Sequence, residues 1–95
     1  MNRIVAIHLL IRGRVQGVGF RDAMLDCVEA IGVAGWVRNT RDGGVEALVQ
    51  GSPNAVQHVV TWCRRGPPLA RVTSVEAEAV EDDPALSRFE RRPTA

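Results

Sequence analysis

Hydrophobic and polar residues alternate along several short stretches of the chain, a pattern that predicts β-strands. The first strand is expected at residues 4–12, where one face is uniformly apolar and should lie under helices. That face is formed by Val5, Ile7, Leu9 and Ile11. The opposite face is mixed, so His8 is expected to be a solvated or half-buried residue of the sheet.

Two stretches instead have the three- and four-residue spacing of helices. In residues 21–31 the apolar stripe is Met24, Cys27, Val28 and Ile31, and Gly32 is suited to end the helix. The second helix should begin at Ser52 and Pro53, a residue pair typical of an N-cap and first turn, and should stop within residues 64–68.

Further strands are expected around these helices. Residues 33–39 and 45–50 read as a β-hairpin, joined by a turn at 40–44 that contains an Asp-Gly pair. Residues 71–80 form another strand, and a short last strand is expected at 88–91. The order β-α-β-β-α-β predicts one α+β domain, residues 1–95, with a ferredoxin-like fold in which two helices cover one face of a mostly antiparallel sheet.

A glycine-rich segment, GRVQGVGFR at residues 13–21, joins the first strand to the first helix. Glycines allow backbone N–H groups to turn toward an anion, and a helix N-terminus adds partial positive charge. Arg21 would add a planar fork for two phosphate oxygens. In this topology the first and second strands are parallel and end at the same edge, so Asn39 should lie close to the loop. The segment therefore predicts a phosphate cradle, although an ordinary strand-to-helix turn fits it too.

Composition narrows the classes of partner. The 95 residues are 45% hydrophobic, carry a net charge of +1 and include four aromatic residues, a poor supply for stacking nucleobases. No apolar run is long enough to span a membrane, and we expect a cytoplasmic monomer with no nucleic-acid or membrane partner. Cys27 and Cys63 are expected to be buried and reduced, and the cysteines and histidines lack the spacing of a zinc site.

The sequence lacks the residues that several classes of phosphate-binding or phosphate-cleaving site require. The segment has no Lys-Ser/Thr pair of a P-loop, no cysteine nucleophile, no aspartate pair for Mg²⁺ and no Ser-His-Asp set. What remains is an anion cradle with one arginine and one amide, and no cofactor or metal is expected. Such a site could hydrolyse an acyl phosphate, because its carboxylate leaves without being protonated.

GRVQGVGFR at residues 13–21, GWVRNT at 35–40 and GPPLARV at 66–72 resemble signature stretches of the acylphosphatase family, at the family's spacing. This resemblance implies metal-independent hydrolysis of a carboxyl–phosphate bond in a small-molecule acyl phosphate. By position, Arg21 matches the substrate-binding arginine and Asn39 the asparagine that orients the attacking water. The backbone of the segment after the first strand matches the phosphate-binding loop, formed by Val15, Gln16, Gly17, Val18, Gly19 and Phe20.

The chain departs from the family pattern directly after the arginine, where Asp22 and Ala23 replace a common aromatic residue. Pairing of Asp22 with Arg21 would weaken phosphate binding. Two alternatives stay open: a non-catalytic phosphate- or carboxylate-binding regulatory module on the same fold, and an RNA-binding ferredoxin-like domain, which the few aromatic residues disfavour.

Overall fold

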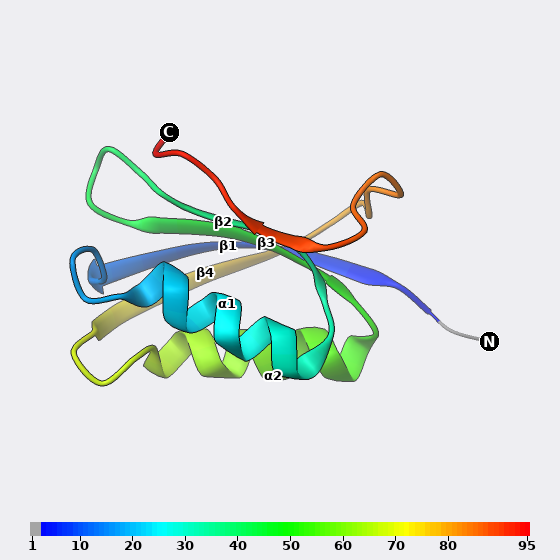
Figure 1. Cartoon of the computed structure of the whole chain (residues 1–95), viewed down its shortest axis with the longest axis horizontal. Coiled ribbons are helices and arrows are strands. Elements are labelled where there is room, and N and C mark those ends of the chain that lie inside the picture. The colour runs from blue at the N-terminus through cyan, green and yellow to red at the C-terminus, as the bar shows by residue number, and fades with distance from the viewer. Residues whose placement is uncertain (1–2) are drawn as a thin grey trace.

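The computed structural model describes residues 3–95 and contains two helices packed on one face of a five-stranded sheet (Figure 1). The fold predicted from the sequence is thereby confirmed. In chain order the elements are β1 (Val5–Arg14), α1 (Phe20–Ile31), β2 (Ala34–Asn39), β3 (Val45–Gly51), α2 (Pro53–Arg65), β4 (Arg71–Val80) and β5 (Phe89–Arg91).

The strands lie in the order β4-β1-β3-β2-β5. Strand β3 pairs antiparallel with both β1 and β2, so these two strands run parallel, as the β-α-β-β-α-β order requires. Strand β5 adds a parallel pair at the edge beside β2, with Arg91 opposite Val37. The short last strand expected from the sequence is therefore present.

The hydrophobic core fills the space between the sheet and the helices. Leu9 and Ile11 of β1 are fully buried there, and Val5 and Ile7 pack against them, which confirms the predicted apolar face of this strand. Helix α1 contributes Met24 and Val28 to the core. Helix α2 contributes Val56, Val59, Val60 and Cys63.

The loop after β1, the β2–β3 turn and the connection from α2 to β4 all lie at one end of the molecule (Figure 1). Strand β1 runs to Arg14, two residues further than predicted, with a register shift between Arg12 and Gly13 where it pairs with β4. The loop proper is thus residues 15–19, and α1 begins at Phe20. This end of the sheet is where the candidate site is found.

No helix within residues 3–95 is long and apolar enough to cross a membrane.

Candidate active site

The loop between β1 and α1 is anchored in the core at both of its ends. Val15 and Phe20 are 1% and 2% exposed, and the Phe20 ring packs edge-on against Trp62 of α2 at a centroid distance of 5.4 Å. Between these anchors, Gly17 and Gly19 adopt left-handed backbone angles, with φ of 73° and 76°. Glycine reaches these angles without strain, so the chain can reverse sharply and enter the helix.

The N-termini of the two helices differ in how their N–H groups are satisfied. At α2 the Ser52 hydroxyl accepts a hydrogen bond from the N–H of Ala55. At α1 the N-cap is Gly19, which has no side chain, and no side-chain cap bonds the first turn. The first N–H groups of α1 therefore remain able to bind an anion, and the helix dipole favours one there.

A small cavity of about 80 Å³ lies at this uncapped helix end. That is the volume of roughly two to three water molecules, a size suited to one tetrahedral anion. Its wall is formed by Val15, Gly17, Gly19, Phe20, Arg21 and Asn39, together with Asp22 and Arg91. Larger hollows of about 470 and 610 Å³ occur elsewhere, one at the far end of β1 and one between the helices. Of these three cavities within residues 3–95, the small one is the one that lies at an uncapped helix end and a glycine loop.

Asn39, the last residue of β2, reaches this cavity from the sheet. Its Oδ1 is buried and accepts no hydrogen bond from any residue in the described part of the chain, 3–95. Few buried polar groups in folded proteins lack a hydrogen-bond partner, and a catalytic role is one explanation for such a group. The strand order explains its position, because β1 and β2 end at the same edge of the sheet.

The structure brings most of the predicted site residues together. Four of the six loop residues line the cavity with Arg21 and Asn39, whereas Gln16 and Val18 do not. Val18 packs partly against the hydrophobic core instead. Within residues 3–95, Arg21 has no carboxylate within ion-pair distance, so the pairing of Asp22 with Arg21 that the sequence left open does not form.

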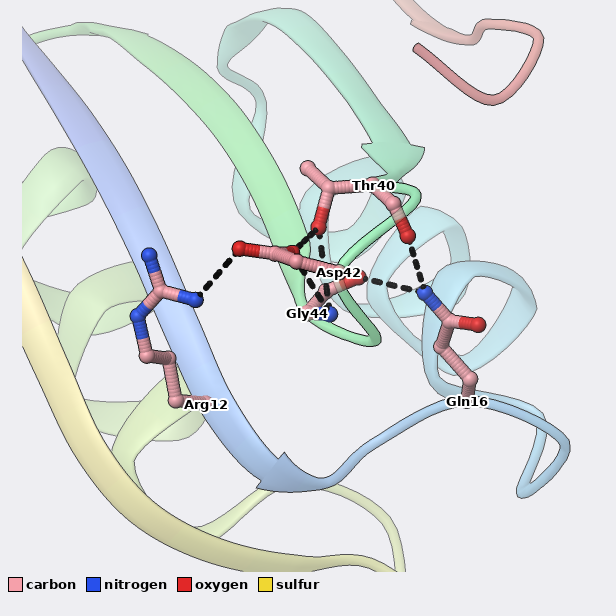
Figure 2. A network of polar contacts seen from close by, with 5 residues as sticks. All are labelled: Arg12, Gln16, Thr40, Asp42 and Gly44. Carbon is pink, nitrogen blue, oxygen red and sulfur yellow. Dashed lines mark hydrogen bonds and ion pairs between the residues drawn. The ribbon is translucent and has the colours of Figure 1, made fainter.

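Gln16 connects the loop to the β2–β3 turn, a role that the sequence did not reveal. Its Nε2 donates to the carbonyl oxygens of Thr40 and Gly44, at 2.7 and 2.9 Å. Figure 2 shows the turn held between Gln16 on one side and Arg12 of β1 on the other. Because Thr40 directly follows Asn39, these bonds fix the loop relative to the asparagine.

Asp42 stabilises the turn from within (Figure 2). It accepts hydrogen bonds from the Thr40 hydroxyl, from Arg12 Nη1 at 2.8 Å and from the Gly44 N–H at 3.3 Å. The bonds from Thr40, Arg12 and Gly44 lower the pKa of Asp42 to about 2. The carboxylate is therefore ionised at neutral pH and serves the turn, while it takes no part in the cavity wall.

The face of the sheet opposite the helices carries a second polar group. Glu46 accepts a hydrogen bond from Arg38 Nε at 2.7 Å and contacts His8 Nε2 at 2.7 Å. Burial opposes ionisation of Glu46, but the bonds to Arg38 and His8 outweigh it and its pKa is lowered. His8 is half-buried as expected, and Arg38, stacked over the Trp36 ring at 4.8 Å, is engaged on this face.

Both cysteines are free thiols, Cys63 buried and Cys27 half-buried. Burial, reinforced by the neighbouring Cys27, raises the pKa of Cys63 to about 12, and burial also raises that of Cys27. Neither thiol lines the cavity at the loop.

A family model described as Acylphosphatase matches residues 7–91 of the chain. The chain belongs to the acylphosphatase family. Among similar proteins, an acylphosphatase of Acidiphilium cryptum is 50% identical over 91 residues, covering 96% of this chain and 99% of its own length. One from Thermococcus kodakarensis is 52% identical over 83 residues, which cover 87% and 90% of the two chains.

The fold agrees with this family. The crystal structure of acylphosphatase from Bacillus subtilis superposes with a TM-score of 0.88 at 34% identity, covering 93% of this chain and 98% of that one. The resemblance seen in the glycine-rich and GWVRNT stretches is thus confirmed for the acylphosphatase family.

Proposed function

We propose that this chain hydrolyses acyl phosphates to a carboxylate and inorganic phosphate, with Arg21 and the loop as the phosphate site and Asn39 as the water-orienting residue. The observation that carries the assignment of roles is Asn39, which lines the cavity at the uncapped start of α1 and whose buried Oδ1 has no hydrogen-bond donor among the described residues. The Asn39 carboxamide can form a hydrogen bond with a water molecule in this cavity, and the helix N–H groups can donate to the phosphoryl oxygens.

The chemistry then follows from the groups available. The loop N–H groups and the Arg21 guanidinium hold the phosphoryl group and stabilise its charge. Water held by Asn39 attacks phosphorus in line, the bond from phosphorus to the acyl oxygen breaks, and the carboxylate leaves with its electron pair. The proton from water passes to a phosphate oxygen. A carboxylic acid has a pKa near 4, so no general acid is needed at the leaving group.

Activity in EDTA tests the proposal directly. Purified protein should hydrolyse benzoyl phosphate in the presence of EDTA, since no step uses a metal. Arg21→Ala should abolish turnover, and Arg21→Lys should lose most of it because a point charge cannot replace the planar fork. Phosphate binding without turnover by the wild-type protein would instead favour the non-catalytic module.

We further propose that the protein works as a single-domain, cytoplasmic monomer without nucleic-acid or membrane partners. The near-neutral charge of +1 supports the absence of a nucleic-acid surface, and the buried free thiol of Cys63 suits a reducing compartment. Sedimentation of the purified protein would test whether it is a monomer, and a filter-binding assay would test whether it binds RNA.

A further inference from the structure

An acidic side chain lines the wall of the cavity in which the phosphate is proposed to bind. Asp22 follows Arg21 in the first turn of α1 and contributes to the same cavity. A carboxylate suits the positive end of a helix, but here it lies in the wall of a proposed site for an anion. Because like charges repel each other, the Asp22 carboxylate by itself opposes phosphate binding.

Arg91 pairs with this carboxylate from the other end of the chain. Its Nη1 donates to Asp22 Oδ1 at 2.5 Å across a sequence separation of 69 residues. Strand β5 places Arg91 beside Val37, a buried residue of the sheet face that carries the helices. Arg91 lines the cavity as well, so both partners of the pair lie at the proposed phosphate site.

The pair is too exposed to matter much for folding. The side chains of Arg91 and Asp22 are 43% and 70% exposed, and ion pairs of this kind contribute little to stability in water. Arg91 does, however, change the net charge of the cavity wall. Arg21, Asp22 and Arg91 together leave one net positive charge, whereas without Arg91 the wall would be neutral.

We propose that Arg91 is a positioning residue of the phosphate site. It holds the Asp22 carboxylate and cancels its charge, so that Asp22 does not repel an anion bound by Arg21. The proposal rests on the proposed function, since it assigns phosphate to this cavity. In this arrangement Arg91 acts through Asp22. Arg91 therefore becomes dispensable for phosphate binding once Asp22 is neutral. A direct phosphate ligand, or a residue with a structural role unrelated to Asp22, would still be needed.

Affinity for inorganic phosphate, measured by calorimetric titration, tests this in four proteins: wild type, Arg91→Gln, Asp22→Asn and the double variant. Arg91→Gln should bind phosphate about 3- to 10-fold more weakly, the size expected for one nearby unscreened charge. The double variant should return to within about twofold of the wild type. Arg91→Lys, which keeps the charge, should retain most of the affinity.

Two charge-matched controls separate this effect from a general change in net charge. Arg92→Gln removes the neighbouring arginine, whose guanidinium stacks over the Trp36 ring at 5.1 Å on the opposite side of the sheet. Asp26→Asn removes an exposed acid one turn further along α1. Both should leave phosphate affinity unchanged. The penalty of Arg91→Gln should also shrink as ionic strength rises from about 0.01 to 0.15 M, because exposed charges are screened.

Kinetics with benzoyl phosphate give an independent measurement. Arg91→Gln should raise KM and leave kcat within about twofold, since the water-orienting amide is untouched. A wild-type protein that binds phosphate but does not turn over benzoyl phosphate contradicts the proposed function, and the four phosphate affinities still decide the role of Arg91.

The proposal is overturned if the double variant binds phosphate as weakly as Arg91→Gln, because Arg91 would then act independently of Asp22. Unchanged affinity in folded Arg91→Gln overturns it equally. Should Arg91→Gln fail to fold, Asp22→Asn decides alone: affinity tighter than wild type supports the proposal, and equal or weaker affinity refutes it. Thermal melting of each variant shows which comparison applies.

Discussion

At the scale of single residues, Asn39 lines the cavity although its unsatisfied Oδ1 destabilises the folded protein. A buried acceptor without a donor costs about 1–3 kcal/mol, which the fold tolerates at this point. Most buried polar groups are satisfied because such costs are a large part of the net stability. The unsatisfied oxygen therefore fits a group held ready for a reactant, and its role stays a prediction until tested.

Asn39→Ala should lower kcat for benzoyl phosphate by about 10²-fold or more, the loss typical of removing one preorganised polar group. Competitive inhibition by inorganic phosphate should survive, because Arg21 and the loop N–H groups remain. Steady-state kinetics with and without phosphate measure both quantities, and Asn54→Ala, at an exposed position of α2, serves as the control. An equal loss of phosphate affinity would contradict a role in orienting water.

Asp42 makes a pH-dependent contribution to stability whose sign follows from its lowered pKa. The pKa is about 2 in the folded protein against an ordinary value of 3.8, chiefly because of the hydrogen bonds from Thr40 and Arg12. Its contribution is thus fully present above pH 4 and is lost as pH falls toward 2. The free energy of unfolding of wild type should exceed that of Asp42→Asn at pH 6, and the difference should vanish near pH 2. Urea unfolding at a series of pH values measures it, and a difference that does not depend on pH would refute the assignment.

At the scale of elements, the site depends on how the β1–α1 loop and the β2–β3 turn are held together. Each is a separate local structure, the loop set by its glycines and the turn by Asp42 and Thr40. Gln16 joins them through two hydrogen bonds to backbone carbonyls. The relative position of phosphate and attacking water should depend on this connection, because the loop binds the phosphate and Asn39, next to the turn, orients the water.

Gln16→Ala should lower kcat/KM about 10-fold, since a small displacement of the loop misaligns the water with phosphorus. The free energy of unfolding should fall by about 1–2 kcal/mol for the two lost bonds. Gln57→Ala, which loses only a surface bond to Thr61 in α2, is the matched control and should change neither value. Wild-type kinetics in folded Gln16→Ala would show that the loop holds its place without the glutamine.

At the scale of the whole molecule, stability and chemistry come from different layers. The core lies between the helices and the sheet, with Met24 of α1 fully buried against Cys63 of α2. The site is at one end of these layers, where loops meet. Substitutions deep in the core should therefore change the unfolding equilibrium more than the turnover of folded molecules.

Met24→Ala should lower the free energy of unfolding by about 2–5 kcal/mol, from lost burial and the cavity left behind. Turnover per folded molecule, measured well below the melting temperature, should stay within a few-fold of wild type. Leu69→Ala, at a position that is 75% exposed, should leave stability nearly unchanged. Thermal and urea unfolding give the stabilities, and a larger effect of Leu69→Ala than of Met24→Ala would refute this location of the core.

The elements, their order and the two stretches that build the site could all be predicted from the amino-acid sequence. Alternation in β1 and helical spacing in α1 and α2 are local consequences of burial on one face, so they can be read without coordinates. The glycines of the loop indicate directly that the backbone there adopts positive φ angles. The order of elements then implies that Asn39 and the loop share an edge, because β1 and β2 must be parallel.

Which side chains contact one another could be seen only in the folded molecule. Asp22 pairs with Arg91 rather than Arg21, and Gln16 reaches the turn rather than the cavity. These contacts depend on the register of β5 against β2 and on side-chain directions, which no local period encodes. Spacing in the sequence fixes what a residue's own element does, whereas the partner of a polar side chain is set by segments that fold against it from far along the chain.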